Sequence, residues 1–227
     1  HFERAHHALE VGRRDGGVAE VAGVIEFEHV TYAYPERAAN GPALRDVSLS
    51  LAGGDFVLAA GPSGSGKSTF LRCLNGLVPH FYGGAFGGRV TVNGLDTRRT
   101  RPEHMAAQVG FVFQDPETQF VTDRLEDEIA FGMENAGAPP MEMKRRVAEL
   151  LERFDLGRLR GRPIHTYSGG EMQRTALASV LALRPSVLAL DEPTSQLDGE
   201  GAEALLSLVS ELRDSLGLTV VVAEHRL

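Results

Sequence analysis

The chain has 227 residues, which is enough for one large domain or for one domain carrying a smaller insertion. Hydrophobic residues make up 42% of the chain and charged residues 24%, a balance that excludes a disordered or fibrous protein. The formal net charge of -8 disfavours a nucleic-acid partner, or a lipid surface, that would be held by bulk positive charge.

Residues 1–23 are rich in charge and glycine, and they predict a linker or tail. Three histidines in this stretch suggest a metal site: His1, His6 and His7. We expect them to be solvated instead, because nothing nearby supplies a fourth ligand. The first residue is not methionine, which leaves open that the chain is cut from a longer polypeptide.

After this tail, the apolar pattern predicts strands alternating with helices. Alternation or short apolar runs predict strands at residues 24–30, 44–51, 56–60, 89–92, 109–113, 187–190 and 218–223. One helix is expected to start at the glycine-rich turn after residue 60 and to run to Gly76, and a glycine loop is expected at residues 83–88. A second helix is expected through residues 205–212. Between the strands at 109–113 and 187–190, the pattern is helical from Glu126 to about Leu183. We therefore predict, within residues 24–227, an α/β domain with a mostly parallel sheet and an inserted helical subdomain at about 115–184.

Cysteine and lysine are both rare in the chain. The single cysteine, Cys73, excludes an internal disulfide or a thiolate zinc site and favours a reducing cytosol. Only Lys67 and Lys144 among the 23 basic residues are lysine, so each lysine needs a reason. No apolar run approaches the roughly 20 residues that a membrane-spanning helix needs, and direct membrane insertion is not expected.

A phosphate loop follows the predicted strand at residues 56–60. The pattern G-x-x-x-x-G-K-[ST] is matched by Gly61, Pro62, Ser63, Gly64, Ser65, Gly66, Lys67, Ser68 and Thr69. The glycines allow successive N–H groups to point at phosphate oxygens, and the following helix adds its positive N-terminal dipole. Lys67 supplies a compact charge for the outer phosphates, and Ser68 is placed to bind Mg²⁺. The alternative is a flexible glycine-serine loop, which the flanking strand and helix disfavour.

Two acids, Asp191 and Glu192, close the apolar strand at residues 187–190. Adjacent carboxylates at the end of a buried strand are unfavourable unless they face a cation or polarise a water molecule. We therefore predict that Asp191 supports a magnesium ion and that Glu192 orients and deprotonates the attacking water. The alternative is a solvated acidic turn, which Pro193 would also suit.

A second anion cradle is predicted at Ser168, Gly169, Gly170 and Glu171, which open a helix. A hydroxyl, free N–H groups and a helix dipole meet there, although the same residues would also make an ordinary helix cap.

Taken in order, these motifs resemble the nucleotide-binding domain of ATP-binding cassette (ABC) proteins. The glutamine loop corresponds to Gln114, the signature to residues 168–171 and the D-loop to Ser195, Gln196, Leu197 and Asp198, while His225 corresponds to the switch histidine. The resemblance covers residues 24–227 and implies a P-loop NTPase core, an N-terminal antiparallel β subdomain and an inserted helical subdomain. It also implies that ATP and Mg²⁺ are the ligands. The sequence departs from the family at Tyr167 and Glu171, which stand where leucine and glutamine are usual.

The resemblance further implies that two such domains pair head to tail, as a homodimer, a heterodimer or a tandem fusion. The phosphate loop, Gln114, Asp191, Glu192 and His225 of one domain would then face Ser168 and Gly170 of the other. Gln114 would join Ser68 and Asp191 around the metal, and His225 would hold the γ-phosphate and water, the alternative being a capping or core histidine. Tyr34 matches the position that stacks on adenine, with Tyr32 as its alternative.

Three branches of the family are disfavoured. A DNA-repair type would carry zinc modules with paired cysteines, whereas Cys73 is alone. A chromosome-maintenance type would insert a long coiled coil between the phosphate loop and the signature, which only residues 70–167 separate. A translation-factor type usually lacks the switch histidine. A transporter ATPase remains.

Residues 113–120, 126–135 and 223–227 are similar to those of energy-coupling-factor and cobalt-type importers. That similarity implies a groove beside the glutamine loop for a helix of an integral membrane subunit, with Phe120, Ile129 and Phe131 as lining candidates unless they are core residues. We therefore expect an ATPase subunit at the cytoplasmic face of the membrane, powering import of a vitamin or transition-metal ion. The alternative is a soluble ABC ATPase that regulates or remodels a cytosolic partner.

Overall fold

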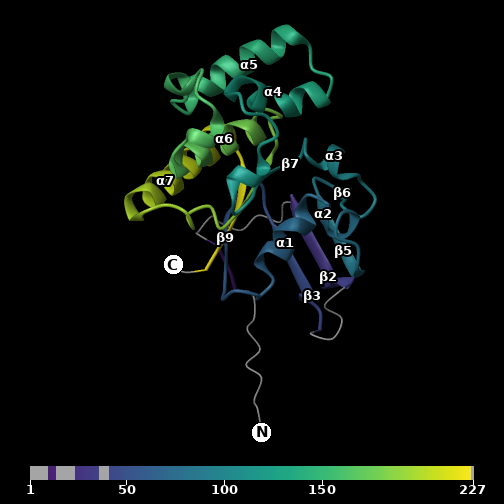
Figure 1. Ribbon diagram of the computed structural model, residues 1–227. Helices are drawn as coiled ribbons and strands as arrows, with labels where there is room; N and C mark the ends of the chain where they lie inside the picture. Colours follow the sequence, from purple (N-terminus) through teal and green to yellow (C-terminus); the bar gives the residue numbers. More distant parts are fainter. Residues whose placement is uncertain (1–9, 14–23, 36–40, 226–227) are drawn as a thin grey trace.

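The computed structural model describes residues 10–13, 24–35 and 41–225. Within them the chain forms a five-stranded sheet and a four-stranded sheet, with helices packed around both (Figure 1). The predicted α/β class is therefore confirmed. Among these residues, no helix combines the length and the apolarity needed to cross a membrane.

The five-stranded sheet is mostly parallel. Its strands are β1 (Glu10–Arg13), β4 (Phe56–Ala60), β7 (Val109–Val112), β8 (Val187–Asp191) and β9 (Thr219–Glu224). Their spatial order is β1-β4-β9-β8-β7, with β1 antiparallel at one edge and the other four parallel. Because parallel strands share the edge at which they end, this order gathers four carboxyl ends side by side.

The four-stranded sheet is antiparallel throughout. It consists of β2 (Ile25–Ala33), β3 (Leu44–Leu51), β5 (Ala85–Val92) and β6 (Leu95–Asp96), in the order β3-β2-β5-β6. Asn93 and Gly94 join β5 to β6 with φ of 50° and 77°, the left-handed pair that a tight hairpin favours. The antiparallel sheet that the family resemblance implied is therefore present.

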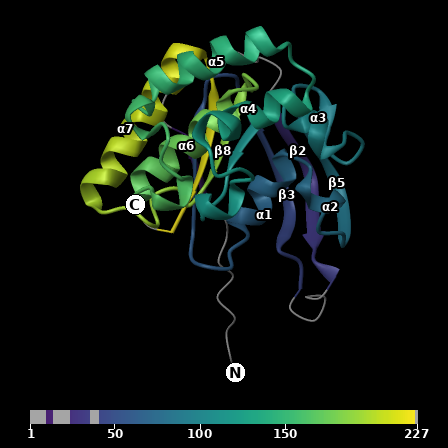
Figure 2. The same cartoon turned by 45° about the horizontal axis from the view of Figure 1, so that its top comes forward.

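Seven α-helices occur among the described residues. They are α1 (Lys67–Leu74), α2 (Leu77–His80), α3 (Pro102–Met105), α4 (Leu125–Asn135), α5 (Pro140–Arg153), α6 (Gly169–Leu181) and α7 (Gly199–Leu216). Single 3₁₀ turns occur at Pro116–Gln119, Gly157–Leu159 and Ile164–Thr166. Helices α4 to α6 lie between β7 and β8 in sequence, and α4 contacts both α5 and α6. Figures 1 and 2 show α5 at the outer edge of the molecule.

Strand β8 shows how the two faces of the parallel sheet are buried. Leu188 and Leu190 pack with the helical side of the molecule, whereas Val187 and Ala189 pack with α1 and the antiparallel sheet. Successive side chains of a strand point to opposite faces, so a strand covered on both faces is apolar throughout. That double burial is why the acids at its end stand out in the sequence.

Two local expectations are wrong. Residues 10–13, predicted as part of a tail, pair with β4 as strand β1. Strand β5 begins at Ala85, so Gly87 and Gly88 belong to a strand rather than to a loop. Gly88 lies where the β2–β5 register shifts, with φ of 80°, and a Cβ there would come within 2.3 Å of the His29 carbonyl oxygen. The remaining tail residues, including all three tail histidines, lie outside the described ranges.

Candidate nucleotide-binding site

The carboxyl ends of the four parallel strands carry the predicted catalytic residues. The phosphate loop follows β4 and Glu192 follows β8. Gln114 lies just after β7, and His225 comes directly after β9. Since β4, β9, β8 and β7 are neighbours in that order, four segments that are distant in sequence converge at one edge of the sheet.

The phosphate loop joins β4 to α1 and depends on a glycine backbone. Gly66 precedes α1 with φ of 102°, and a Cβ there would lie 2.5 Å from the Ala43 carbonyl oxygen. Only glycine satisfies both conditions, so the loop turns directly into a helix whose first N–H groups are free to meet an anion. Lys67 is 3% exposed, and its Nζ donates to the carbonyl oxygens of Gly61 (2.8 Å) and Pro62 (3.2 Å). The ammonium group is thus held inside its own loop.

Asp191 ends β8 and faces the first turn of α1. The Ser68 Oγ donates to Asp191 Oδ1 at 2.9 Å. Asp191 is 2% exposed, and burial raises its pKa, while the bond from Ser68 and the charges of Arg72 and Lys67 oppose that shift. A hydroxyl beside a buried carboxylate suits Mg²⁺, which takes oxygen ligands and uses few from the protein.

Glu192 connects the lysine with the histidine. Its Oε1 lies 2.6 Å from His225 Nε2 and 3.7 Å from Lys67 Nζ, and His225 Nδ1 lies 3.3 Å from the same Nζ. The Glu192 backbone is left-handed, with φ of 49°, and its N–H donates to the Ala223 carbonyl oxygen at 2.9 Å. This conformation costs about 1–2 kcal/mol for a residue with a side chain, so the surrounding fold must impose it.

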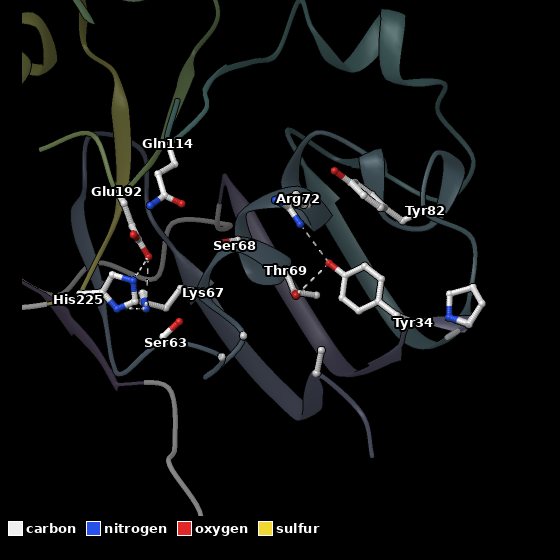
Figure 3. A pocket seen from close by; sticks show the side chains of 14 residues that line it. Tyr34, Ser63, Lys67, Ser68, Thr69, Arg72, Tyr82, Gln114, Glu192 and His225 are labelled. Carbon is white, nitrogen blue, oxygen red and sulfur yellow. Dashed lines mark hydrogen bonds and ion pairs between the residues drawn. The ribbon is translucent and has the colours of Figure 1, made fainter. Parts of the chain in front are cut away.

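One cavity of about 600 Å³ contains this cluster (Figure 3). The predicted site residues that line it are Tyr34, Ser63, Gly64, Gly66, Lys67, Ser68, Thr69, Gln114, Glu192 and His225. Tyr34 therefore faces the cavity, and its Oη lies 3.1 Å from Thr69 Oγ1. Tyr32, its alternative, is fully buried and donates to the Gly83 carbonyl oxygen at 2.7 Å.

Four further lining residues were not predicted from the sequence: Pro35, Ala43, Arg72 and Tyr82. Arg72 lies one turn after Ser68 on α1, so helical periodicity would have placed it on the same face. Tyr82 comes from the segment between α2 and β5, and no sequence pattern assigned it to the site.

Besides the free N–H groups at the start of α1, the buried hydroxyl of Ser65 also favours a triphosphate in the loop. Ser65 Oγ is buried and has no hydrogen-bond partner within the described part of the chain. A buried hydroxyl without a partner is unfavourable by roughly 1–3 kcal/mol, and a phosphate oxygen in the loop would satisfy it.

The signature lies outside the residues that line the cavity. Residues 168–171 start α6, where Gly169 packs beside the D-loop: a Cβ there would lie 3.3 Å from the Gln196 carbonyl oxygen. Asp198 caps α7 by accepting from the Gly201 N–H at 2.8 Å. The signature and the D-loop are therefore neighbours, and neither lines the cavity that contains this chain's own phosphate loop.

Glu171 and Tyr167, the two residues that differ from the usual signature, both make contacts within this chain. Glu171 Oε2 accepts from the Ser168 N–H at 2.9 Å, and Oε1 lies 3.0 Å from Arg158 Nη1 and 3.8 Å from Arg162 Nη1. These backbone and charge contacts hold the pKa of Glu171 below its usual range, with the Ser168 backbone the largest cause. Tyr167 is buried, and its hydroxyl donates to the carbonyl oxygens of Leu159 (3.2 Å) and Arg162 (3.3 Å).

A groove of about 320 Å³ adjoins the glutamine loop. Among its lining residues are Phe113, Gln119, Val121, Phe131, Val180 and Leu183. Of the three residues expected to line it, Phe131 does so, whereas Ile129 is fully buried in the core and Phe120 packs against that core. Gln119 Oε1 accepts from the Phe113 N–H at 3.1 Å, next to Gln114.

Comparison with known proteins identifies the family. The family described as ABC transporter matches residues 44–195. A putative ABC transporter ATP-binding protein of Streptomyces coelicolor is 52% identical over 204 residues, which are 90% of this chain and 36% of that protein. One of Pyrococcus abyssi is 45% identical over 202 residues, 89% of this chain and 71% of that protein. The chain thus spans about a third of the Streptomyces relative.

Solved structures agree on the fold. The structure of cbiO1 from Clostridium perfringens, part of the ABC transporter complex cbiONQ, aligns with a TM-score of 0.77 and 30% identity over 91% of this chain and 80% of that one. A dimeric post-hydrolysis structure of the ATP-binding cassette MJ0796, bound to ADP and Pi, aligns with a TM-score of 0.73 and 27% identity over 89% of this chain and 88% of that one.

Proposed function

The chain belongs to the ABC transporter family of ATP-binding domains, which bind ATP with Mg²⁺ and hydrolyse it, and from this membership we propose that it powers an energy-coupling-factor type importer. The cargo would be a vitamin or a transition-metal ion, recognised by separate membrane subunits. The chain would work at the cytoplasmic face of the membrane. The groove beside the glutamine loop is the observation that carries this proposal.

Within the site we assign each side chain one task. Lys67 contacts the outer phosphates, and it must exchange its bonds to the loop carbonyls for phosphate oxygens. Ser68, Gln114 and Asp191 hold Mg²⁺, which neutralises phosphate charge when bound.

Glu192 accepts the proton of the attacking water in this proposal, and His225 orients the water and the terminal phosphate. Their contact of 2.6 Å supports this pairing of a base with an orienting residue. Residues 168–171 and Asp198 are left for the nucleotide of a second domain, since they lie outside this chain's own cavity. That second domain is a copy, a paralogue or a fused cassette.

The groove is suited to a helix from a membrane subunit. Its lining combines apolar side chains with Gln119. The Gln119 side chain accepts a hydrogen bond from the N–H of Phe113, the residue directly before Gln114. An occupant that displaces Gln119 would therefore move the glutamine loop. Docking in the groove would in this way be linked to the metal and the phosphates.

Substitution of Val121, which lines the groove and is 62% exposed, tests the transporter proposal. Tagged wild-type protein recovered from native membranes should carry integral membrane subunits, and Val121→Asp should lose them while its own ATPase activity stays normal. Met141→Asp is the matched control, because Met141 is 78% exposed on α5, outside the groove. Recovery of the wild type with soluble partners only would instead support a regulatory or remodelling ABC ATPase.

Glu192→Gln tests the assigned base separately from transport. The variant should bind ATP, lose turnover and accumulate as an ATP-bound dimer in size-exclusion chromatography. Glu200→Gln, at an exposed position on α7, should hydrolyse ATP normally. Normal turnover in Glu192→Gln would overturn the role assigned to Glu192.

A further inference from the structure

The cavity has a second end, away from the phosphate loop. Tyr34, Arg72 and Tyr82 lie together there, while Lys67, Glu192 and His225 occupy the other end (Figure 3). If the loop holds the phosphates, the base and ribose of a nucleotide must extend toward the aromatic end. This follows from ATP binding and is independent of any role in transport.

The two tyrosine rings form a corner. The Tyr34 and Tyr82 ring centroids are 5.9 Å apart and the ring planes are perpendicular, at 90°. In this geometry one ring points its edge at the face of the other. A planar base that stacks on the first ring therefore also points its edge at the second ring. The corner can contact a base on two sides without the rings moving apart.

Arg72 holds this corner together. Its guanidinium carbon lies 5.0 Å from the centroid of the Tyr82 ring, and Nη1 donates to Tyr34 Oη at 3.4 Å. A guanidinium over an aromatic face is an attractive contact. The Arg72 Nε is buried and has no hydrogen-bond partner among the described residues. One arginine thus contacts the Tyr82 ring and the Tyr34 hydroxyl, and it retains an unused donor beside the cavity.

We propose that Tyr82, positioned by Arg72, is a second base-recognition residue of the nucleotide site, which binds the purine of ATP together with Tyr34. Tyr82 supplies aromatic surface, and Arg72 fixes the angle between the rings. Stacking platforms made by aromatic and arginine side chains accept nucleobases because every base has a π-face.

The test compares ATP with inorganic tripolyphosphate, which has the phosphates but no base. Tyr82→Ala should weaken ATP binding about 2-fold to 12-fold, the range for loss of one edge-to-face aromatic contact. Its affinity for tripolyphosphate should remain within about twofold of wild type. Tyr82→Phe keeps the ring and should restore ATP affinity. Phe81→Ala is the matched control: Phe81 is 76% exposed, and it contacts Tyr82 without lining the cavity.

Two outcomes would overturn the proposal: unchanged ATP affinity in Tyr82→Ala, or equal loss of both probes. Lys67→Ala separates this inference from the assigned phosphate site, because it should weaken both probes together. If Lys67→Ala binds both probes normally, the phosphate site is assigned wrongly, whatever Tyr82→Ala does.

Discussion

Replacing Glu171 by glutamine would restore the residue usual in the family signature, and we expect it to destabilise this protein. A glutamine oxygen can still accept from the Ser168 N–H, so the cap at the start of α6 survives. What is lost is the negative charge beside Arg158 and Arg162, whose side chains are 55% and 45% exposed. Such solvent-screened pairs contribute about 0.2–1 kcal/mol, and the charge at a helix N-terminus contributes about 0.3–1 kcal/mol. The expected loss is therefore about 1 kcal/mol, or a Tm lower by roughly 2–4 °C for a chain of this size.

The sign of the pH dependence separates charge from packing. The pKa of Glu171 is lowered in the folded state, so its charge stabilises the fold above the unfolded value of about 4.3. That contribution is lost as the pH falls from this value through the lower folded-state pKa. The difference between wild type and Glu171→Gln should accordingly be full at pH 7 and shrink in acid. Glu171→Ala also leaves the Ser168 N–H without its acceptor, and should lose about 1–3 kcal/mol more at either pH.

Urea unfolding followed by circular dichroism, at pH 7 and near pH 4, measures these differences. A double-mutant cycle with Arg158→Ala provides the control, because the effect of Glu171→Gln should be smaller when Arg158 is absent. A glutamine variant as stable as wild type at pH 7 would refute the reasoning. So would a stability difference that persists unchanged in acid.

Three further substitutions test other parts of the structure. Burial raises the pKa of Asp191, so folding disfavours its charge above an unfolded value of about 3.9. Asp191→Asn should therefore raise the unfolding free energy at pH 7 by about 0.5–2 kcal/mol while Mg²⁺-dependent ATPase activity falls, and a lower Tm would contradict this. The left-handed backbone of Glu192 predicts that Glu192→Gly is more stable than Glu192→Ala by about 0.5–1 kcal/mol in urea unfolding, the reverse of the usual order. Arg146 is buried and donates to the Leu181 carbonyl oxygen at the end of α6 at 2.6 Å, so Arg146→Met should lose about 1.5–3 kcal/mol. Arg145→Met, at an exposed position, should have the unfolding free energy of wild type. An equal loss of unfolding free energy in the two variants would contradict the role given to the Arg146–Leu181 bond.

Most strands and the chemical motifs could be predicted because their signals are local. Strands β3 and β4 have the bounds that alternation and apolar runs predicted, and residues 61–66 form the turn that their glycines require, directly before α1. The acids at the end of β8 were recognisable because they interrupt a strand that is buried on both faces. Spacing of a few residues is enough for these features, since each depends on its own backbone and nearest neighbours.

Other assignments depend on contacts between segments that are far apart in sequence. The pattern left Tyr32 open as the alternative to Tyr34. Tyr32 belongs to β2 and pairs with both β3 and β5, whereas Tyr34 follows the end of β2 and lines the cavity. Likewise Ile129 and Phe131 lie on one helix, yet one is core and the other lines the groove.

The sequence by itself therefore determined which chemical groups are available: a phosphate loop, an acid pair, a glutamine loop, a signature and a switch histidine. Only the tertiary structure decided how they meet. The order β4-β9-β8-β7 brings Lys67, Glu192 and His225 within hydrogen-bond or ion-pair distance and leaves the signature outside the cavity. The tertiary structure also places Tyr82, from the segment between α2 and β5, beside Arg72 of α1, a contact that no local pattern encodes. Strand order and register are long-range choices, made by the burial of both sheet faces rather than by any one segment.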